Sequence, residues 1–287
     1  MISIKEQYFP LLRQFPHRLN RWQYLNPKRM PGYRLISGHP ISVAEYVLPE
    51  IPGIPGGKCI AFVTDLHYHR SRKSLRILHH LEKLLSSYSP DYLLLGGDMV
   101  GDATDIPALE EILPQLRKRA DVCLAAGGNW EYGKVWLGRN FWKEFYARQD
   151  IRFLENETWA DGNIVFSAVA DVSSGICKLP EMNMNKLNIM MAHSPDTAVA
   201  LDRRKRQYFP QIILCGHTHG GQVNLPIINV PLRIHSHYGN FFAHGVFHHK
   251  IWKTTMFVCA GLNELSFPWR FNCRRELLII KTSGPEK

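Results

Sequence analysis

The chain beyond residue 58 alternates short apolar runs with stretches of helical spacing. Runs of strand length occur at 59–64, 92–95 and 122–126. Apolar residues three or four positions apart predict a helix over 74–87, and a second helix is expected over 106–119. The helical spacing of the first is carried by Leu75, Leu78, Leu81 and Leu85. This strand-helix order predicts right-handed crossovers and a parallel sheet with helices outside it.

The second half contains more strands and fewer helices. Strand-length runs lie at 152–154, 164–170, 187–192, 212–215, 256–260 and 277–280. Helices are expected over 136–148 and 196–206. A mixed sandwich of two sheets with flanking helices accommodates both halves in one core, so the predicted fold class is α/β.

Composition places the chain among ordinary globular proteins. Its 287 residues are 45% apolar and 21% charged, and they are near the upper limit for a single hydrophobic core. The Pro- and Gly-rich stretch 49–57 predicts a linker, which divides an arm and linker, 1–57, from a domain, 58–287. The sequence shows neither a spanning apolar run nor a secretory signal. The six cysteines have no close pair, which favours reduced thiols and a cytoplasmic location.

The formal charge of +10 is concentrated near the start of the chain. Residues 1–40 hold seven lysines and arginines against one acidic residue, Glu6, with aromatic and leucine side chains between them. Such a segment is typical of an anchor at an anionic membrane surface. The alternative is an arm packed on the domain with a solvated basic face. Nucleic acid is a less favoured partner, because no recognition module accompanies the charge.

Five of the apolar runs end in residues that ligate metals. They are followed by Asp65 and His67, by Asp98, by Asn129, by His193, and by His217 and His219. Ligands in open α/β sheets bind beyond the carboxyl ends of the strands, so these side chains are expected to converge. Nitrogen and oxygen ligands without thiolate favour Mn²⁺, with Fe or Zn²⁺ as alternatives. Seven ligands exceed one tetrahedral site and predict two divalent metal ions.

The ordered motifs resemble those of the calcineurin-like metallophosphoesterases. The segments 265–273, 220–222 and 237–239 look like the YkuE/YaeI-type branch of that superfamily. The resemblance covers about residues 59–282 and implies a four-layer α/β/β/α sandwich with a binuclear metal centre. It implies one metal held by Asp65, His67, Asp98 and His219 and another held by Asp98, Asn129, His193 and His217, with Asp98 as the bridge.

Two cations side by side would clamp a phosphoryl group and activate water, so the implied activity is hydrolysis of a phosphoester or pyrophosphate. One motif departs from the family pattern. Trp130 follows Asn129 where the family usually has a histidine, and an indole cannot act as a general acid. We predict that His69 supplies the missing proton donor; the alternative is that His69 is an ordinary polar loop residue.

The branch implies a phosphodiesterase of the cell envelope, and the specific expectation is a UDP-2,3-diacylglucosamine pyrophosphatase of lipid A synthesis on the inner membrane face. The basic arm would meet anionic lipid, and the segment 225–249 is either a lipid-facing flap or an ordinary hairpin. Two alternatives remain open. One is a soluble phosphodiesterase or phosphatase of small substrates, and the other is a catalytically weak metal-bound scaffold.

Overall fold

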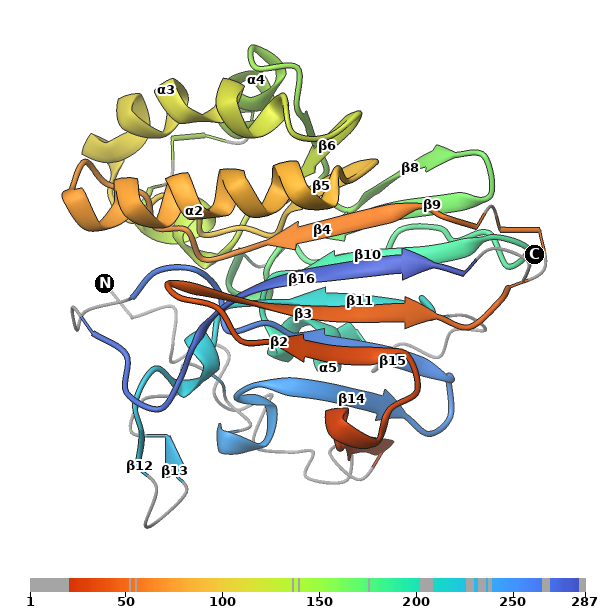
Figure 1. The fold of residues 1–287 in the computed structure, drawn as a ribbon. Helices are drawn as coiled ribbons and strands as arrows, with labels where there is room; N and C mark the ends of the chain where they lie inside the picture. Colours follow the sequence, from red (N-terminus) through yellow and green to blue (C-terminus); the bar gives the residue numbers. More distant parts are fainter. Residues whose placement is uncertain are drawn as a thin grey trace.

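A computed structural model shows how the chain folds (Figure 1). It describes residues 21–51, 53–54, 56–135, 137–138, 140–174, 176–201, 209–225, 230–231, 236, 239–264 and 269–283. The described residues form two large mixed sheets that pack face to face, with helices on their outer faces. This is the predicted α/β sandwich, and its layers follow the order α/β/β/α.

The first sheet has seven strands. In spatial order they are β2 (Tyr33–Ile36), β3 (Ile41–Leu48), β16 (Arg275–Thr282), β4 (Cys59–Val63), β5 (Tyr92–Leu95), β6 (Val122–Ala125) and β7 (Arg152–Phe153). The run from β4 to β7 is parallel, as the strand-helix alternation predicted. The strand β16 lies between β3 and β4, parallel to the former and antiparallel to the latter.

The second sheet also has seven strands. Their spatial order is β1 (Trp22–Leu25), β14 (Gly245–His249), β15 (Thr254–Val258), β11 (Ile212–Cys215), β10 (Leu187–Ala192), β9 (Ile164–Val169) and β8 (Glu157–Asp161). The four central strands, β15, β11, β10 and β9, are parallel to one another. A separate two-stranded ribbon joins β12 (Asn224–Leu225) to β13 (Val230–Pro231).

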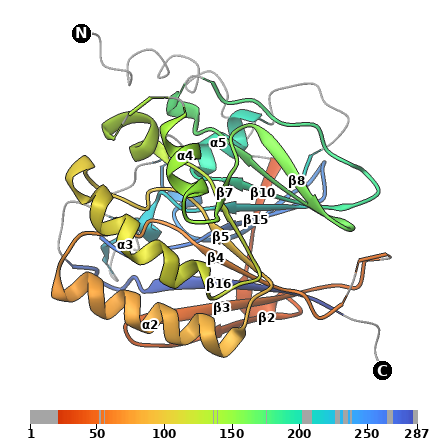
Figure 2. The same cartoon turned by 90° about the horizontal axis from the view of Figure 1, so that it is seen from above.

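Three apolar clusters hold the layers together. One lies between the first sheet and the helices α2 (Arg72–Tyr88), α3 (Ile106–Arg117) and α4 (Phe141–Ala147). A second fills the space between the sheets, where Phe62 and Phe166 are almost fully buried. The third lies between the second sheet and α5 (Pro195–Leu201). Figure 2 shows α2 and α3 along one side of the molecule, and α5 close to β10 and β15.

The helix α2 illustrates how sequence specifies an element. Ser71 caps its first turn by accepting a hydrogen bond from the Ser74 backbone N–H, and the buried face carries Leu78, Leu81 and Leu85. Leu75, which belonged to the predicted apolar spacing, is instead 53% exposed. Ile77 is buried on that face, because a period of 3.6 residues turns position 75 away from the sheet.

Five strands of the two large sheets were not predicted: β1, β2, β3, β8 and β14. The first three belong to the predicted arm, 1–57, whose described part thus contributes strands to both sheets. The boundary at residue 58 stays a prediction. One predicted helix is shorter than expected, because α4 begins at Phe141 rather than 136. The helix α5 begins at Pro195, one residue before the predicted start, and the structure describes it as far as Leu201.

The structure also bears on the predictions about membrane-spanning segments, cysteines and the flap, for the residues that it describes. None of the helices that the structure describes has the length and apolar character needed to cross a bilayer. All six cysteines are free thiols. Within the predicted flap 225–249, residues 245–249 form β14 between β1 and β15. Much of the remaining flap, and residues 1–20 of the arm, lie outside the described residues.

Candidate metal centre

The seven predicted ligands meet at one edge of the sandwich, where five strands end. They follow β4 (Asp65, His67), β5 (Asp98), β6 (Asn129), β10 (His193) and β11 (His217, His219). Parallel neighbours bring their carboxyl ends to the same edge of a sheet, and the two sheets face each other there. The topology therefore places side chains from distant parts of the sequence around one point.

The ligand atoms form two clusters. The first contains Asp65, His67 and His219, and the second contains Asp98, His193 and His217; within each, the atoms lie within 4.8 Å of one another. Asp98 Oδ2 lies 3.7 Å from His67 Nε2 and 3.2 Å from His193 Nε2. Asn129 Oδ1 lies 2.7 Å from His217 Nδ1. Asp98 thus lies between the two clusters, and Asn129 belongs with the second.

The backbone at these positions is unusual. Five of the seven residues have positive φ: Asp65 (52°), His67 (36°), Asp98 (52°), His217 (70°) and His219 (51°). Such conformations are costly for residues with a Cβ and cluster at functional sites. Two glycines allow the loops to approach closely. A Cβ on Gly216 would lie 2.3 Å from Asp65 Oδ2, and one on Gly128 would lie 2.2 Å from Asp98 Oδ1.

Backbone carbonyls fix the orientation of two imidazoles. His193 Nδ1 is 2.9 Å from the Gly96 carbonyl oxygen and His219 Nδ1 is 2.9 Å from that of Asn263. A carbonyl only accepts, so each Nδ1 carries the proton and each Nε2 faces the centre. Burial lowers the pKa of His219 to about 3, so its ring is neutral and its Nε2 presents a lone pair. This arrangement matches the way metal-ligating histidines are held in proteins.

The donor set fits divalent cations. The His219 Nε2 atom, which carries the lone pair, lies 3.5 Å from Asp65 Oδ1 and 3.3 Å from His67 Nε2. A neutral imidazole nitrogen and a carboxylate oxygen repel each other unless a cation or proton lies between them. His67 Nδ1 is also buried without a hydrogen-bond partner among the described residues. Convergent imidazole and carboxylate groups in a buried site are suitable ligands for Mn²⁺, Fe or Zn²⁺.

The two carboxylates are held in their ionised form. Asp65 and Asp98 are both buried, which opposes ionisation. The imidazolium of His193, at 4.0 Å from Asp65 Oδ1 and 3.2 Å from Asp98 Oδ2, outweighs burial and holds the pKa of both carboxyl groups below the usual range. Asp65 Oδ2 also accepts the backbone N–H of His217 at 3.0 Å. The centre therefore presents fixed negative charge.

Glu131 organises the loops that carry Asp98 and Asn129, a role that sequence reasoning missed. Its buried carboxylate accepts three backbone N–H groups, from Asp98 at 2.9 Å, Met99 at 2.9 Å and Gly128 at 2.8 Å. Burial, together with the Asp98 charge, raises the pKa of Glu131 to about 7. Glu131 ends the motif 128–131, so its position beside a predicted ligand was the available signal.

Trp130 and His69 border the centre on the side of His67. The rings of Trp130 and His67 meet edge to face, with centroids 5.1 Å apart. His69 is exposed, and its Nδ1 lies 3.1 Å from the His67 carbonyl oxygen and 3.4 Å from Ser74 Oγ. If Nδ1 donates to that carbonyl, Nε2 is the atom that could exchange protons with a ligand. The catalytic role of His69 stays a prediction.

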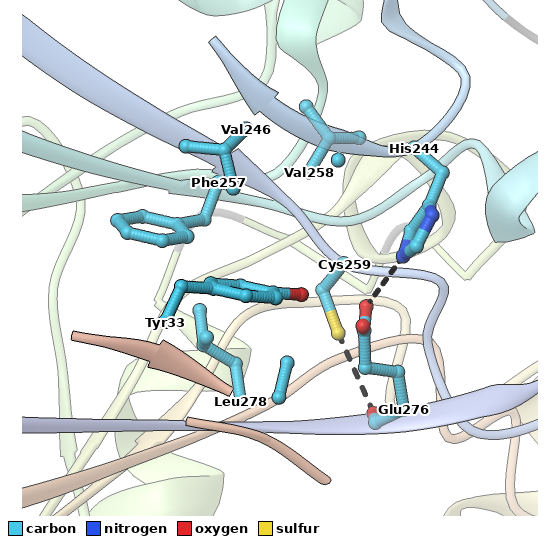
Figure 3. A pocket seen from close by; sticks show the side chains of 10 residues that line it. Tyr33, His244, Val246, Phe257, Val258, Cys259, Glu276 and Leu278 are labelled. Atoms are coloured by element: carbon cyan, nitrogen blue, oxygen red, sulfur yellow. Dashed lines mark hydrogen bonds and ion pairs between the residues drawn. The ribbon is translucent and has the colours of Figure 1, made fainter. Parts of the chain in front are cut away.

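Figure 3 shows an ion pair between His244 and Glu276, and this pair supports the loop behind Asp65. The buried Glu276 Oε2 accepts a hydrogen bond from His244 Nε2 at 2.9 Å and another from the Ala260 backbone N–H at 3.0 Å. The backbone N–H of Glu276 also donates to the Gly261 carbonyl at 3.2 Å. Gly261 packs so closely on Asp65 that a Cβ there would lie 2.7 Å from Asp65 Cβ. Glu276 thus positions the turn against which Asp65 rests.

This ion pair predicts a pH dependence of stability. The His244 side chain is 43% exposed, and the Glu276 carboxylate outweighs its partial burial and raises the pKa of His244 above 6.5. The stabilisation is therefore fully present below the unfolded pKa of about 6.5 and is lost as pH rises through the folded value. We expect the melting temperature of the protein to fall between pH 6 and 8, and Glu276→Gln to flatten that fall.

Thermal unfolding followed by circular dichroism at several pH values measures this effect. His79→Gln removes an exposed histidine on α2 and serves as the matched control, which should keep the wild-type pH profile. An unchanged profile in Glu276→Gln would show that the pair contributes nothing to the pH dependence.

Comparison with known proteins identifies the family. The model of the calcineurin-like phosphoesterase family matches residues 60–221, more than half of the chain. Phosphodiesterase YaeI of Escherichia coli is 28% identical over 234 residues, which are 77% of this chain and 81% of YaeI. The metallophosphoesterase YkuE of Bacillus subtilis is 25% identical over 270 residues, covering 87% of this chain and 88% of YkuE.

A third relative is longer than this chain. The Caenorhabditis elegans protein F40B5.2 is 28% identical over 244 residues, which are 78% of this chain and 48% of that protein, so the match spans about half of its length.

Three observations lead to one conclusion about the family. They are the extent of the family match, the two clusters of ligand atoms at the strand ends, and the likeness to YaeI and YkuE. The chain belongs to the calcineurin-like phosphoesterases and is a metal-dependent phosphoester hydrolase.

Proposed function

We propose that this protein hydrolyses phosphodiester or pyrophosphate bonds at a centre of two divalent cations. Asp65, His67, Asp98 and His219 would hold one cation, and Asp98, Asn129, His193 and His217 would hold the other. The observation that carries the proposal is the convergence of the His219 Nε2 lone pair, oriented by the Asn263 carbonyl, with the Asp65 carboxylate at 3.5 Å. Groups that accept hydrogen bonds and repel one another are placed together because cations lie between them.

Two cations at such a centre supply charge for the phosphoryl oxygens and lower the pKa of water toward neutrality. The residues of the chain hold the proposed metal ligands in position. Glu131 ties the loop of Asp98 to the loop of Asn129, and the Gly96 and Asn263 carbonyls fix the two imidazoles. The placement is rigid before substrate arrives, so little reorganisation is needed on binding.

Metal removal and reconstitution test the proposal. Protein stripped of metal by chelation is expected to lose hydrolysis of bis(p-nitrophenyl) phosphate, and added Mn²⁺, Fe²⁺ or Zn²⁺ is expected to restore it to different extents. Metal content per chain should approach two at full activity. Undiminished hydrolysis by verified metal-free protein would contradict the proposal.

The proposed substrate is UDP-2,3-diacylglucosamine, cleaved at its pyrophosphate by enzyme lying on the inner membrane face. Support comes from the likeness to phosphodiesterase YaeI and from the basic and aromatic composition of residues 1–40. The lysine and arginine side chains of this segment would contact phosphate and anionic head groups, while its aromatic rings would contact acyl chains. Turnover of UDP-2,3-diacylglucosamine far above that of bis(p-nitrophenyl) phosphate would support this substrate, and the reverse order would favour a phosphodiesterase or phosphatase of small soluble substrates.

Membrane action has a separate test. Vesicles of phosphatidylglycerol and phosphatidylethanolamine are expected to pellet the full chain but not a variant lacking residues 1–20. That deletion leaves β1 and β2 intact, whereas removal of 1–40 would take a strand from each sheet. Equal pelleting of both forms, or of neither, would contradict a membrane role for this segment.

Trp130 favours a second candidate function. Its indole packs on His67 where the family usually has a histidine, which would suit a metal-bound scaffold with weak catalysis. Two bound metals without turnover of either substrate would support the scaffold. Efficient Mn²⁺-dependent turnover of either substrate would exclude it.

Replacement of His69 tests the proposed proton donor. Because general acids typically contribute about 10²–10⁴ in rate and His69 lies in an exposed loop, we expect His69→Ala to lower kcat about 10²-fold at saturating Mn²⁺. The loss should be smaller for substrates with a p-nitrophenolate leaving group, which needs no proton. His79→Ala is the control. An unchanged kcat for a substrate with a poor leaving group would remove His69 from the mechanism.

A further inference from the structure

A groove of about 630 Å³ lies beside the candidate metal centre and has not been assigned a role above. Its walls come from segments far apart in sequence, which are 37–40, 269–270 and 273–275 together with Glu264. Its volume lies within the range of sites that bind small molecules, about 300–1,000 Å³. The groove joins the loop after β2 to the segment that precedes β16.

Hydrogen bonds connect the groove directly to the centre. Arg270, which lines the groove, donates from Nη1 to the Ala260 carbonyl at 2.7 Å and to the His219 carbonyl at 3.3 Å. Its Nη2 donates to the Asn263 carbonyl at 2.5 Å, the same oxygen that orients the His219 ring. Arg270 therefore links the groove directly to the loop of His219, a proposed metal ligand. A substrate in the groove could also reach the metal centre.

The groove carries a positive charge that the described residues do not neutralise. Arg275 is paired with Glu264, the one carboxylate in the lining. Arg274 is exposed and contacts the neutral Ser37 hydroxyl, and Arg270 contacts backbone carbonyls. Neither Arg270 nor Arg274 forms an ion pair within the described part of the chain, and Arg270 Nε is buried there without a hydrogen-bond partner. An anionic group suits these guanidinium groups, because arginine binds phosphate with charge-assisted hydrogen bonds.

A large ring borders the same groove. Trp269 is 52% exposed, which is unusual for the largest apolar side chain. Half-exposed indoles serve as stacking surfaces for flat ligand rings, and the stacking tolerates different rings because each has a π face. An aromatic surface next to unpaired arginine charge is a combination that recognises a ring bearing phosphate.

We propose that this groove binds the part of the substrate that carries a nucleoside monophosphate unit, with the ring against Trp269 and the phosphate against Arg274. The proposal rests on the proposed hydrolase function and extends it to the class of substrate. Arg270 positions the groove against the His219 loop. The metal centre then receives the scissile phosphoryl group of a molecule whose nucleotide end is held outside the centre.

Calorimetric titration of the full Mn²⁺-loaded chain with UMP, uridine and inorganic phosphate tests the proposal without relying on turnover. UMP is expected to bind at least about 10-fold more tightly than phosphate or uridine, since both groups contribute. Arg274→Ala and Trp269→Ala are each expected to weaken UMP binding about 10-fold. Arg274→Ala should weaken phosphate binding as well, whereas Trp269→Ala should leave it unchanged. Trp269→Phe keeps a ring and should retain most of the affinity.

Arg148→Ala, at an exposed arginine directly after α4, is the matched control and should bind like the wild type. Equal affinities for UMP and phosphate, or UMP binding that neither groove variant alters, would overturn the proposal. Failure of the hydrolase function would appear instead as absent Mn²⁺-dependent turnover, whatever the titrations show.

Discussion

Replacement of Asp98 by asparagine is expected to lower the rate of phosphodiester hydrolysis more than about 10³-fold. Bound cations lower the pKa of water toward neutrality, and that effect depends on the ligands that hold them. Asp98 lies between both clusters, at 3.7 Å from His67 Nε2 and 3.2 Å from His193 Nε2, so its charge serves both proposed cations. Asparagine keeps the shape and removes the charge.

Hydrolysis of bis(p-nitrophenyl) phosphate and metal content per chain should be measured together. We expect Asp98→Asn to bind less than two metal ions, with circular dichroism like that of the wild type. Asp121→Asn, an exposed aspartate next to β6, is the control and should retain both metals and full activity. Normal turnover in Asp98→Asn would show that this carboxylate does not bridge the centre.

Glu131→Ala is expected to destabilise the fold by at least about 3 kcal/mol. The substitution leaves three buried backbone N–H groups without an acceptor, and each unsatisfied buried group costs about 1–3 kcal/mol. Glu131→Gln is expected to be intermediate, because its amide keeps one acceptor oxygen but turns an NH₂ group toward backbone donors. Metal affinity should fall as well, since Glu131 positions the Asp98 loop.

Urea unfolding measures this loss of stability. Glu144→Ala, an exposed glutamate on α4, provides the control and should change the free energy of unfolding by less than about 0.5 kcal/mol. If Glu131→Ala were as stable as the wild type, water would have to replace the carboxylate as the acceptor, and the proposed positioning role would be wrong.

Sequence alone predicted the central strands and the meeting of the seven ligands. Buried parallel strands read as continuous apolar runs, and 59–64 and 212–215 are such runs, with Asp65 and His217 one and two positions after them. The edge strands gave no such signal. Three of the four residues of β2, Tyr33–Ile36, are exposed, and β8 at Glu157–Asp161 has no buried residue. Neither short segment shows the apolar pattern of a buried strand.

The supporting groups of the centre were beyond sequence reasoning for a different reason. The Asn263 carbonyl orients His219, and the Glu276 carboxylate holds the turn at Gly261. Both contacts join segments far apart in the chain, and a backbone carbonyl has no distinguishing residue type. Glu131 was closer to discovery, because it lies two residues from Asn129, but its three hydrogen bonds depend on the positions of two loops.

The position of β16 also bears on how the protein is made. This strand pairs with β3 on one side and β4 on the other, yet it leaves the ribosome after every other described strand. During synthesis β3 and β4 therefore lack their common neighbour. The backbone edges that later pair with β16 stay unpaired, and an apolar face stays uncovered. Pairings so distant in sequence are slow to form. The nascent chain thus exposes two strand edges that favour aggregation until Arg275–Thr282 has been translated.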